Sequence, residues 1–180
     1  MIECIFGNNV AENHGGGLQI TGLAPRFRNC IITNNLAKGW GGGGVNTYST
    51  RPIFENCTIE NNFAEDGWGG GVRVEYKTHT TFRNCSIIGN TAHTVGGGIN
   101  NTEGTASLLM NCMIRNNTAQ EVGGGIHAWR TDVNLIECTI SGNRAGNDGG
   151  GIFDNQSEVR INKSACQENI PNDIRHIARP

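Results

Sequence analysis

Polar and aromatic side chains recur at two fixed positions after a series of glycine triplets, and their types are those that bind carbohydrate. Each triplet is followed by an apolar residue, and the first and third residues beyond it include Asn46, Tyr48, Arg73, Glu75, Asn100, His127 and Trp129. Amide, guanidinium and imidazole groups make directional hydrogen bonds, and an aromatic plane suits the apolar face of a sugar ring. The pattern fits two interpretations, an ordinary solvated sheet face and a glycan-binding face, and the residues of the second would be the seven named here.

Trp129 is the leading aromatic residue of this predicted face. It stands beside His127 and Arg130, so an apolar plane has polar neighbours. In a strand it shares the side of His127, whereas Ile126 and Ala128 point to the other side. We therefore expect Trp129 to point outward; the alternative is that it packs under the variable turn that follows.

The same residues do not define a catalytic centre. Arg73 and His127 lie two repeats apart, about 9.6 Å if each repeat adds one strand spacing, which is near enough to bracket a sugar. No acid and base pair with shifted pKa values follows from the sequence, so catalytic residues stay unknown. The sequence predicts no metal site and no cofactor.

The positions of these residues are set by an internal repeat of about 27 residues. Cysteines step along the chain by 26 to 28 residues, at Cys4, Cys30, Cys57, Cys85, Cys112, Cys138 and Cys166. Two, five and seven residues after each of the first six cysteines come an apolar residue, an asparagine and an alanine. Six glycine triplets recur with the same period and account for 18 of the 27 glycines.

This repeat predicts an all-β fold, a right-handed parallel β-helix of about six coils with three short strands in each. A first strand follows the triplet, a second reaches an apolar residue such as Phe82, and the third is Cys-x-Ile. The alternative is a leucine-rich-repeat horseshoe, whose spacing also fits Phe82 to Ala92. That fold needs a helix or a comparable convex segment where the triplets lie, and each glycine costs about 1 kcal/mol in a helix.

Two columns of asparagine have separate predicted roles. One column directly precedes four of the seven repeat cysteines and supplies a left-handed bend, at Asn29, Asn56, Asn84 and Asn111. The other column follows the third strand and is expected to form a side-chain hydrogen-bond ladder between coils, at Asn9, Asn35, Asn62, Asn90, Asn117 and Asn143.

The glycine triplets must meet a conformational demand, because 18 glycines in place of alanine cost on the order of 10 kcal/mol. Positive φ at a corner is one such demand. Close packing of another backbone against a bare stripe is the other.

The cysteine column is expected to hold buried free thiols. In-register stacking keeps Cβ atoms about 4.8 Å apart, beyond the roughly 3.5–4.5 Å that a disulfide prefers. A straight column also cannot surround zinc with four ligands.

Composition limits the remaining possibilities. The repeats fill residues 1–166, and residues 167–180 form a predicted non-repeat tail or cap whose prolines are expected to prevent strand pairing. A net charge of −2 without a basic run argues against nucleic-acid binding, and no apolar run is long enough to insert in a membrane. The chain begins inside a repeat, so we expect its N-terminal end to stack on another chain or on a further segment of a longer protein.

The stretch FGNNVAENHGGGL, Phe6 to Leu18, resembles the repeats of the chlamydial polymorphic outer membrane proteins, which pair an F-x-x-N motif with G-G-A-I. It is also similar to the right-handed β-helix repeats of large secreted bacterial proteins with the pectin-lyase-like fold. The similarity covers about residues 1–166. The chain departs from the chlamydial pattern, because later repeats carry isoleucine for the phenylalanine and every triplet has glycine for the alanine.

The resemblance implies an extracellular or cell-surface setting. It favours a structural or adhesive solenoid segment of a bacterial surface protein, which stacks with other protein chains end to end or laterally. The alternative is a polysaccharide-binding module, or a polysaccharide lyase or hydrolase, because enzymes of the pectin-lyase-like fold bind sugar on the first sheet. The polygalacturonase motifs N-T-D and G-H-G do not occur in the sequence.

Overall fold

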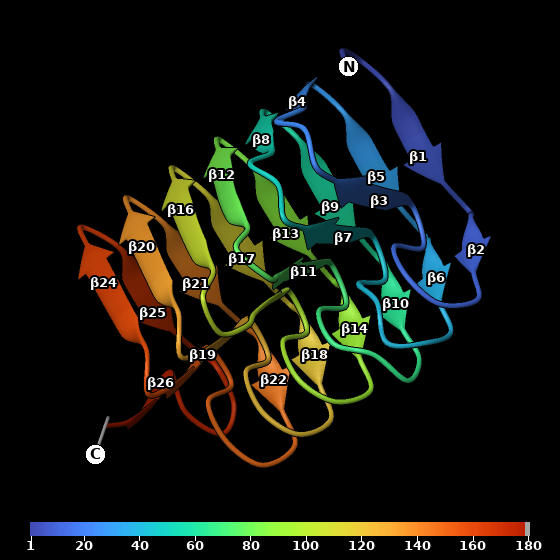
Figure 1. The fold of residues 1–180 in the computed structure, drawn as a ribbon. Helices are drawn as coiled ribbons and strands as arrows, with labels where there is room; N and C mark the ends of the chain where they lie inside the picture. Colours follow the sequence, from blue (N-terminus) through green and yellow to red (C-terminus); the bar gives the residue numbers. More distant parts are fainter. Residues whose placement is uncertain (179–180) are drawn as a thin grey trace.

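The computed structural model describes residues 1–178, and within them it shows a solenoid of short parallel strands without any helix (Figure 1). Each strand pairs with the equivalent strand of the next coil, as Val72 pairs with Val45 on one side and with Ile99 on the other. The predicted parallel β-helix is confirmed, and the leucine-rich horseshoe is wrong.

Four parallel sheets run along the solenoid, numbered here in the order in which the chain meets them after a triplet. The first sheet contains β3 (Leu18–Thr21), β7 (Val45–Tyr48), β11 (Val72–Glu75), β15 (Ile99–Asn101), β19 (Ile126–Trp129), β23 (Ile152–Asn155) and β26 (Ile174–Ile177). The second contains β4 (Arg26–Arg28), β8 (Ile53–Glu55), β12 (His79–Arg83), β16 (Ala106–Met110), β20 (Asp132–Ile136) and β24 (Glu158–Asn162). The third contains β1 (Ile5–Gly7), β5 (Ile31–Thr33), β9 (Thr58–Glu60), β13 (Ser86–Ile88), β17 (Met113–Arg115), β21 (Thr139–Ser141) and β25 (Ala165–Gln167). The fourth contains β2 (Val10–Ala11), β6 (Leu36–Ala37), β10 (Phe63–Ala64), β14 (Thr91–Ala92), β18 (Thr118–Ala119) and β22 (Arg144–Ala145).

The fourth sheet corrects the prediction of three strands in each coil. Its strands have two residues and begin directly after the ladder asparagine, as β6 follows Asn35. The preceding residue, Asn34, has a φ of 54°, and this left-handed conformation turns the chain out of the third sheet. The corner consists of only two residues, Asn34 and Asn35. The third and fourth strands therefore look like one continuous strand in the sequence pattern.

The core consists of identical side chains stacked coil upon coil. Phe27, Phe54 and Phe82 are fully buried, and their rings stack at centroid distances of 4.9 and 5.2 Å. Leu109 and Leu135 continue this column. Parallel columns of isoleucine and alanine fill the rest of the interior, at Ile32, Ile59, Ile87, Ile114, Ile140, Ala37, Ala64, Ala92, Ala119 and Ala145.

The asparagine ladder forms as predicted and satisfies the backbone at the corner before the fourth sheet. Asn62 donates from its backbone N–H and from Nδ2 to Oδ1 of Asn90, at 3.0 and 2.9 Å. Its Nδ2 also donates to the carbonyl of Ile32 at 3.0 Å. The column runs from Asn9 through Asn143 and adds one member that the sequence pattern missed, Asn169. Each ladder amide from Asn35 to Asn143 therefore has partners in both neighbouring coils.

The bend asparagines also adopt the predicted conformation. Their φ values lie between 51° and 53°, at Asn29, Asn56, Asn84 and Asn111. This left-handed bend separates the second sheet from the third.

The glycine triplets combine the two predicted reasons for glycine, a positive φ and close packing of another backbone. Gly96, the first of its triplet, has a φ of 67°, which side chains rarely tolerate. A Cβ added to Gly97, the second, lies only 2.5 Å from the carbonyl oxygen of Gly124 in the next coil. The triplets therefore combine a left-handed corner with close approach of successive backbones.

Part of the predicted C-terminal tail continues the solenoid. Asn169 joins the ladder, and β26 pairs in parallel with β23. The expectation that prolines prevent pairing is wrong for Ile174–Ile177, because Pro171 lies before the strand. Residues 179–180 of the predicted tail lie outside the described residues.

Replacing Asn90 with alanine is expected to lower the free energy of unfolding by about 3 kcal/mol or more. The change removes the acceptor for Asn62 N–H and Nδ2 and the donor to the carbonyl of Ile59, and each buried unpaired group costs about 1–3 kcal/mol. Urea unfolding measures the loss. Asn9→Ala is the matched control, because Asn9 is the exposed end of the ladder and should cost less than about 1 kcal/mol. Equal losses at both positions would contradict the ladder's role.

Candidate functional site

The first column of the predicted glycan face lies under loops. Asn46, Arg73 and Asn100 are only 0%, 8% and 2% exposed. The turns that lead from the fourth sheet to the first fold over them: the N–H of Gly42 donates to Asn46 Oδ1 at 3.4 Å, and Arg73 Nη1 donates to the carbonyl of Trp40. These three side chains of the predicted glycan face are therefore buried and not open to solvent, because the sequence pattern does not show where the turns go.

Asn46, Arg73 and Glu75 form a closed network in the second and third coils. Glu75 accepts from Asn46 Nδ2 at 2.8 Å and pairs with Arg73 Nη2 at 2.9 Å. The Arg73 guanidinium also lies 4.5 Å from the centre of the Trp68 ring. Burial lowers the pKa of Arg73, and the Glu75 carboxylate opposes that shift. These side chains fasten the loops to the sheet and offer little to a ligand.

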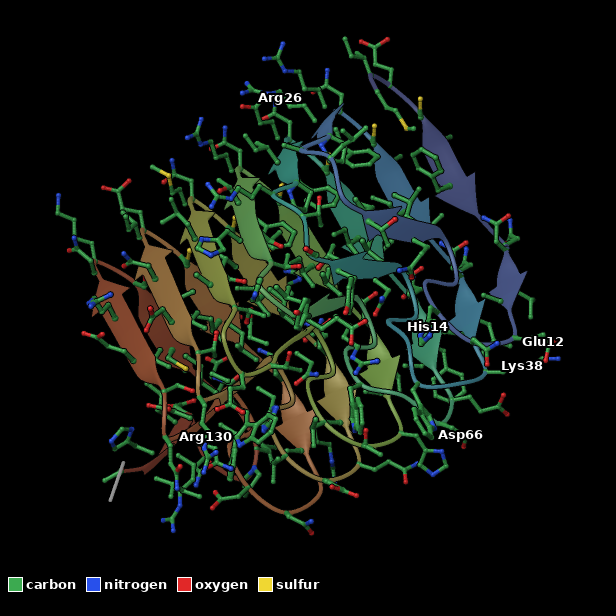
Figure 2. All side chains as sticks on the ribbon, in the orientation of Figure 1. Glu12, His14, Arg26, Lys38, Asp66 and Arg130 are labelled. Atoms are coloured by element: carbon green, nitrogen blue, oxygen red, sulfur yellow. The ribbon has the colours of Figure 1, made fainter. Side chains whose placement is uncertain are left out.

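The aromatic residues of the second column keep one side open. Tyr48 is 42% exposed and stacks on Tyr76 with ring centres 4.9 Å apart. Trp129 is 39% exposed, and the guanidinium of Arg130 lies 5.8 Å from its ring centre. Trp129 is the last residue of β19. Arg130, which is labelled in Figure 2, follows it directly and shows where this strand ends.

Three of the seven predicted residues meet in one pocket of about 300 Å³, which spans several coils of the first sheet. Asn100 and His127 are register neighbours on β15 and β19, and Trp129 pairs with Asn155 on β23. The pocket is lined by Trp68, Val95, Asn100, Thr102, His127, Trp129 and Asn155. Two tryptophans and a valine around an amide and an imidazole give it an apolar wall with a few polar groups, as in ligand sites generally.

His127 is held in one neutral form in this pocket. Its Nδ1 lies 2.7 Å from Oδ1 of Asn100, and because that oxygen only accepts, Nδ1–H donates. Burial lowers the pKa of His127 from its ordinary 6.5 to about 4. The Phe153 ring stacks on the imidazole at 5.8 Å. Near neutral pH, Nε2 is therefore an uncharged acceptor.

Trp68 and Val95 were missed by the sequence analysis because they belong to the variable turns. They occupy the position directly before the triplet, which reads Gly41, Trp68, Val95, Val122 and Asp148 in successive coils. The sequence could have indicated them, because the residue directly before each triplet lies next to the first sheet and three of these residues are apolar.

The cysteines are free and carry no metal-binding geometry. All seven are unpaired, as predicted, and five are buried. Burial raises the pKa of Cys166 to about 12, with the Asp173 carboxylate adding to the shift, so this group stays a thiol. Across residues 1–178 no cluster of three metal-ligating side chains occurs. Nor does that part of the chain hold a helix of the length and apolarity that crossing a membrane requires.

Comparison with protein families gives two matches. A family model described as right handed beta helix region matches residues 2–136. The Chlamydia polymorphic membrane protein repeat matches residues 137–155. No curated protein and no solved structure shows significant similarity to the chain.

The neutral His127 makes stability depend on pH in a defined window. The unfolded chain protonates this imidazole near pH 6.5 and the folded chain only near pH 4, so the stabilisation is complete above pH 6.5. It is lost as the pH falls toward 4, by up to about 3 kcal/mol. His127→Asn, which offers an amide near the position of Nδ1, should flatten the urea-unfolding free energy over that range. His93→Asn, at an exposed residue, is the control and should keep the wild-type profile; a wild-type profile for His127→Asn would refute the assignment.

Proposed function

The chain belongs to the right-handed β-helix family, and from this membership we propose that it serves as a structural or adhesive solenoid segment of a bacterial surface protein. In this role its N-terminal coil stacks on another protein chain or on a further segment of a longer protein. The observation that carries the proposal is the difference between the two ends of the solenoid.

The N-terminal coil presents an open end of the ladder and of the sheets. Asn9 donates from its N–H and from Nδ2 to Asn35 Oδ1 at 3.0 and 2.9 Å, while its own Oδ1 accepts nothing from the residues that the structure describes. Ile2, Ile5 and Val10 of the same coil are exposed. An unpaired strand edge with apolar neighbours is a template for another strand.

The C-terminal coil is closed by an acidic side chain. Asp173 Oδ1 accepts from the N–H of Asn169 at 3.0 Å and from its Nδ2 at 2.8 Å. These are the two bonds that a further ladder asparagine would accept, so Asp173 takes its place. Among the described residues, the ladder therefore keeps a free acceptor at the N-terminal coil, whereas at the C-terminal coil both ladder donors of Asn169 are already bonded to Asp173.

The surface setting of the proposal is supported by the Chlamydia polymorphic membrane protein repeat at residues 137–155. That match names a membrane-protein repeat. The matched residues begin at Glu137, directly after β20 of the second sheet, and end with β23 of the first sheet. The stacked, fully paired coil is the unit that such a repeat extends. A solenoid segment is accordingly the role that fold and family support together.

The pocket supports a second candidate, a glycan-binding module. Its tryptophans and neutral hydrogen-bonding groups lie on the first sheet, across successive coils. We propose this as an additional role, because a binding pocket and an open end lie in different coils and do not exclude each other.

End-to-end association predicts a concentration-dependent dimer of the chain, near twice 19.3 kDa, in which the open strand edges of two N-terminal coils pair. The two ladders do not join in this dimer, because the Oδ1 of Asn9 is an acceptor in both chains. Gln19→Pro should abolish it. Leu18 N–H bonds to Gly44, so the next amide, Gln19 N–H, faces the open side, and proline removes that donor while being tolerated on an edge strand. Light scattering over a concentration series measures the mass.

Gln19→Ala is the matched control, since it keeps the backbone donor and should still dimerise. A wild-type chain that stays monomeric at every concentration, or a Gln19→Pro variant that still associates, would overturn the proposal. Open-ended polymers would contradict the closure by Asp173.

A further inference from the structure

We propose that the pocket between Trp68 and Trp129 binds one uncharged pyranose unit of a polysaccharide and discriminates against uronate units. The inference rests on the second candidate function above and names the class of ligand. It is carried by three features of the pocket: its lack of charge, the fixed polarity of His127 and its two tryptophans.

No side chain that lines the pocket brings a formal charge near neutral pH. The two nearby guanidinium groups stay outside the lining and have anionic partners: Arg73 pairs with Glu75 at 2.9 Å, and Arg130 lies 3.7 Å from Glu103. Arg130 is also held by a hydrogen bond from Nε to Gln156 at 3.0 Å. Both guanidinium groups stack on the tryptophan rings, but neither lines the pocket and each is already paired. A uronate carboxylate would therefore lose water here without gaining a free counter-charge from the lining, and burial of an unpaired charge is strongly unfavourable.

The hydrogen-bonding state of His127 also favours an uncharged sugar over a uronate. Its Nδ1–H is committed to Asn100 at 2.7 Å, so Nε2 presents a lone pair. A sugar hydroxyl can donate to that lone pair, whereas an ionised carboxylate only accepts hydrogen bonds and would be repelled. The low pKa of the imidazole, about 4, keeps it from turning into a cation when the ligand approaches at neutral pH.

The two tryptophans supply the apolar contact that a ring needs. Trp68 comes from a loop and Trp129 from β19, so they line the pocket from different elements. Indole planes pack on the C–H faces of a pyranose and leave its hydroxyl edge free for hydrogen bonds. A volume of about 300 Å³ is at the lower end for ligand pockets, which fits a single ring of a longer polymer.

The test is isothermal titration calorimetry of the full chain with cellotetraose, mannotetraose and tetragalacturonate at pH 7. We expect at least one neutral tetrasaccharide to bind, with tetragalacturonate at least about tenfold weaker. Trp129→Ala should weaken neutral binding by about fivefold or more with little change in melting temperature. Trp40→Ala is the matched control, because Trp40 is exposed on a loop and does not line the pocket; it should bind as the wild type does.

Two further variants keep the result interpretable if Trp129→Ala is unstable. Trp129→Phe retains a ring and should restore most of the affinity, while His127→Asn removes the Nε2 acceptor and should weaken neutral binding. Equal or tighter binding of tetragalacturonate, lost in Trp129→Ala, would overturn the neutral class but keep the glycan-binding role. Absence of binding by all three probes at millimolar concentration would overturn both, and binding indifferent to Trp129→Ala would place the site elsewhere.

Discussion

In-register stacking at a single strand spacing is the constraint on which the rest of this structure depends. Because every coil pairs with the next over all four sheets, each side chain faces its own counterpart about 4.8 Å away. A buried position must then hold a residue that packs against itself, as phenylalanine does by stacking and asparagine by donating and accepting at once. Glycine triplets meet the same constraint, since only a bare backbone lets successive corners approach this closely.

This constraint explains how much of the fold could be predicted from the sequence. Columns such as Cys30 to Cys57 or Asn35 to Asn62 are read directly from the chain, because self-packing forces the same residue type to recur. The fourth sheet was not found, since its corner is a two-residue conformational change at positions such as Asn34 that leaves the period unchanged. The extra ladder member, Asn169, was missed because the last coil is shortened and places it three residues after Cys166, where earlier coils need five.

The candidate site was only partly predictable for a related reason. Alternation along β19 correctly placed His127 and Trp129 away from the interior, but it carries no information on the turns that cover them. Trp68 and Arg73 are not repeated in neighbouring coils, and it is these unrepeated residues that fold a loop onto the sheet and shape the pocket wall. Positions fixed by stacking therefore build the scaffold, while the wall of the candidate pocket is formed where the repeat is broken.

The same reasoning applies to the ends. Identical coils can be added to a solenoid without limit, because the asparagine of each new coil supplies the side-chain acceptor for the coil before it. The ladder ends where a residue of another type takes the place of asparagine. Asp173 does this because it accepts both ladder bonds from Asn169 and has no side-chain amide to donate to a further coil. Replacement of an amide by a carboxylate at one position thus converts a propagating ladder into a closed one at the last coil.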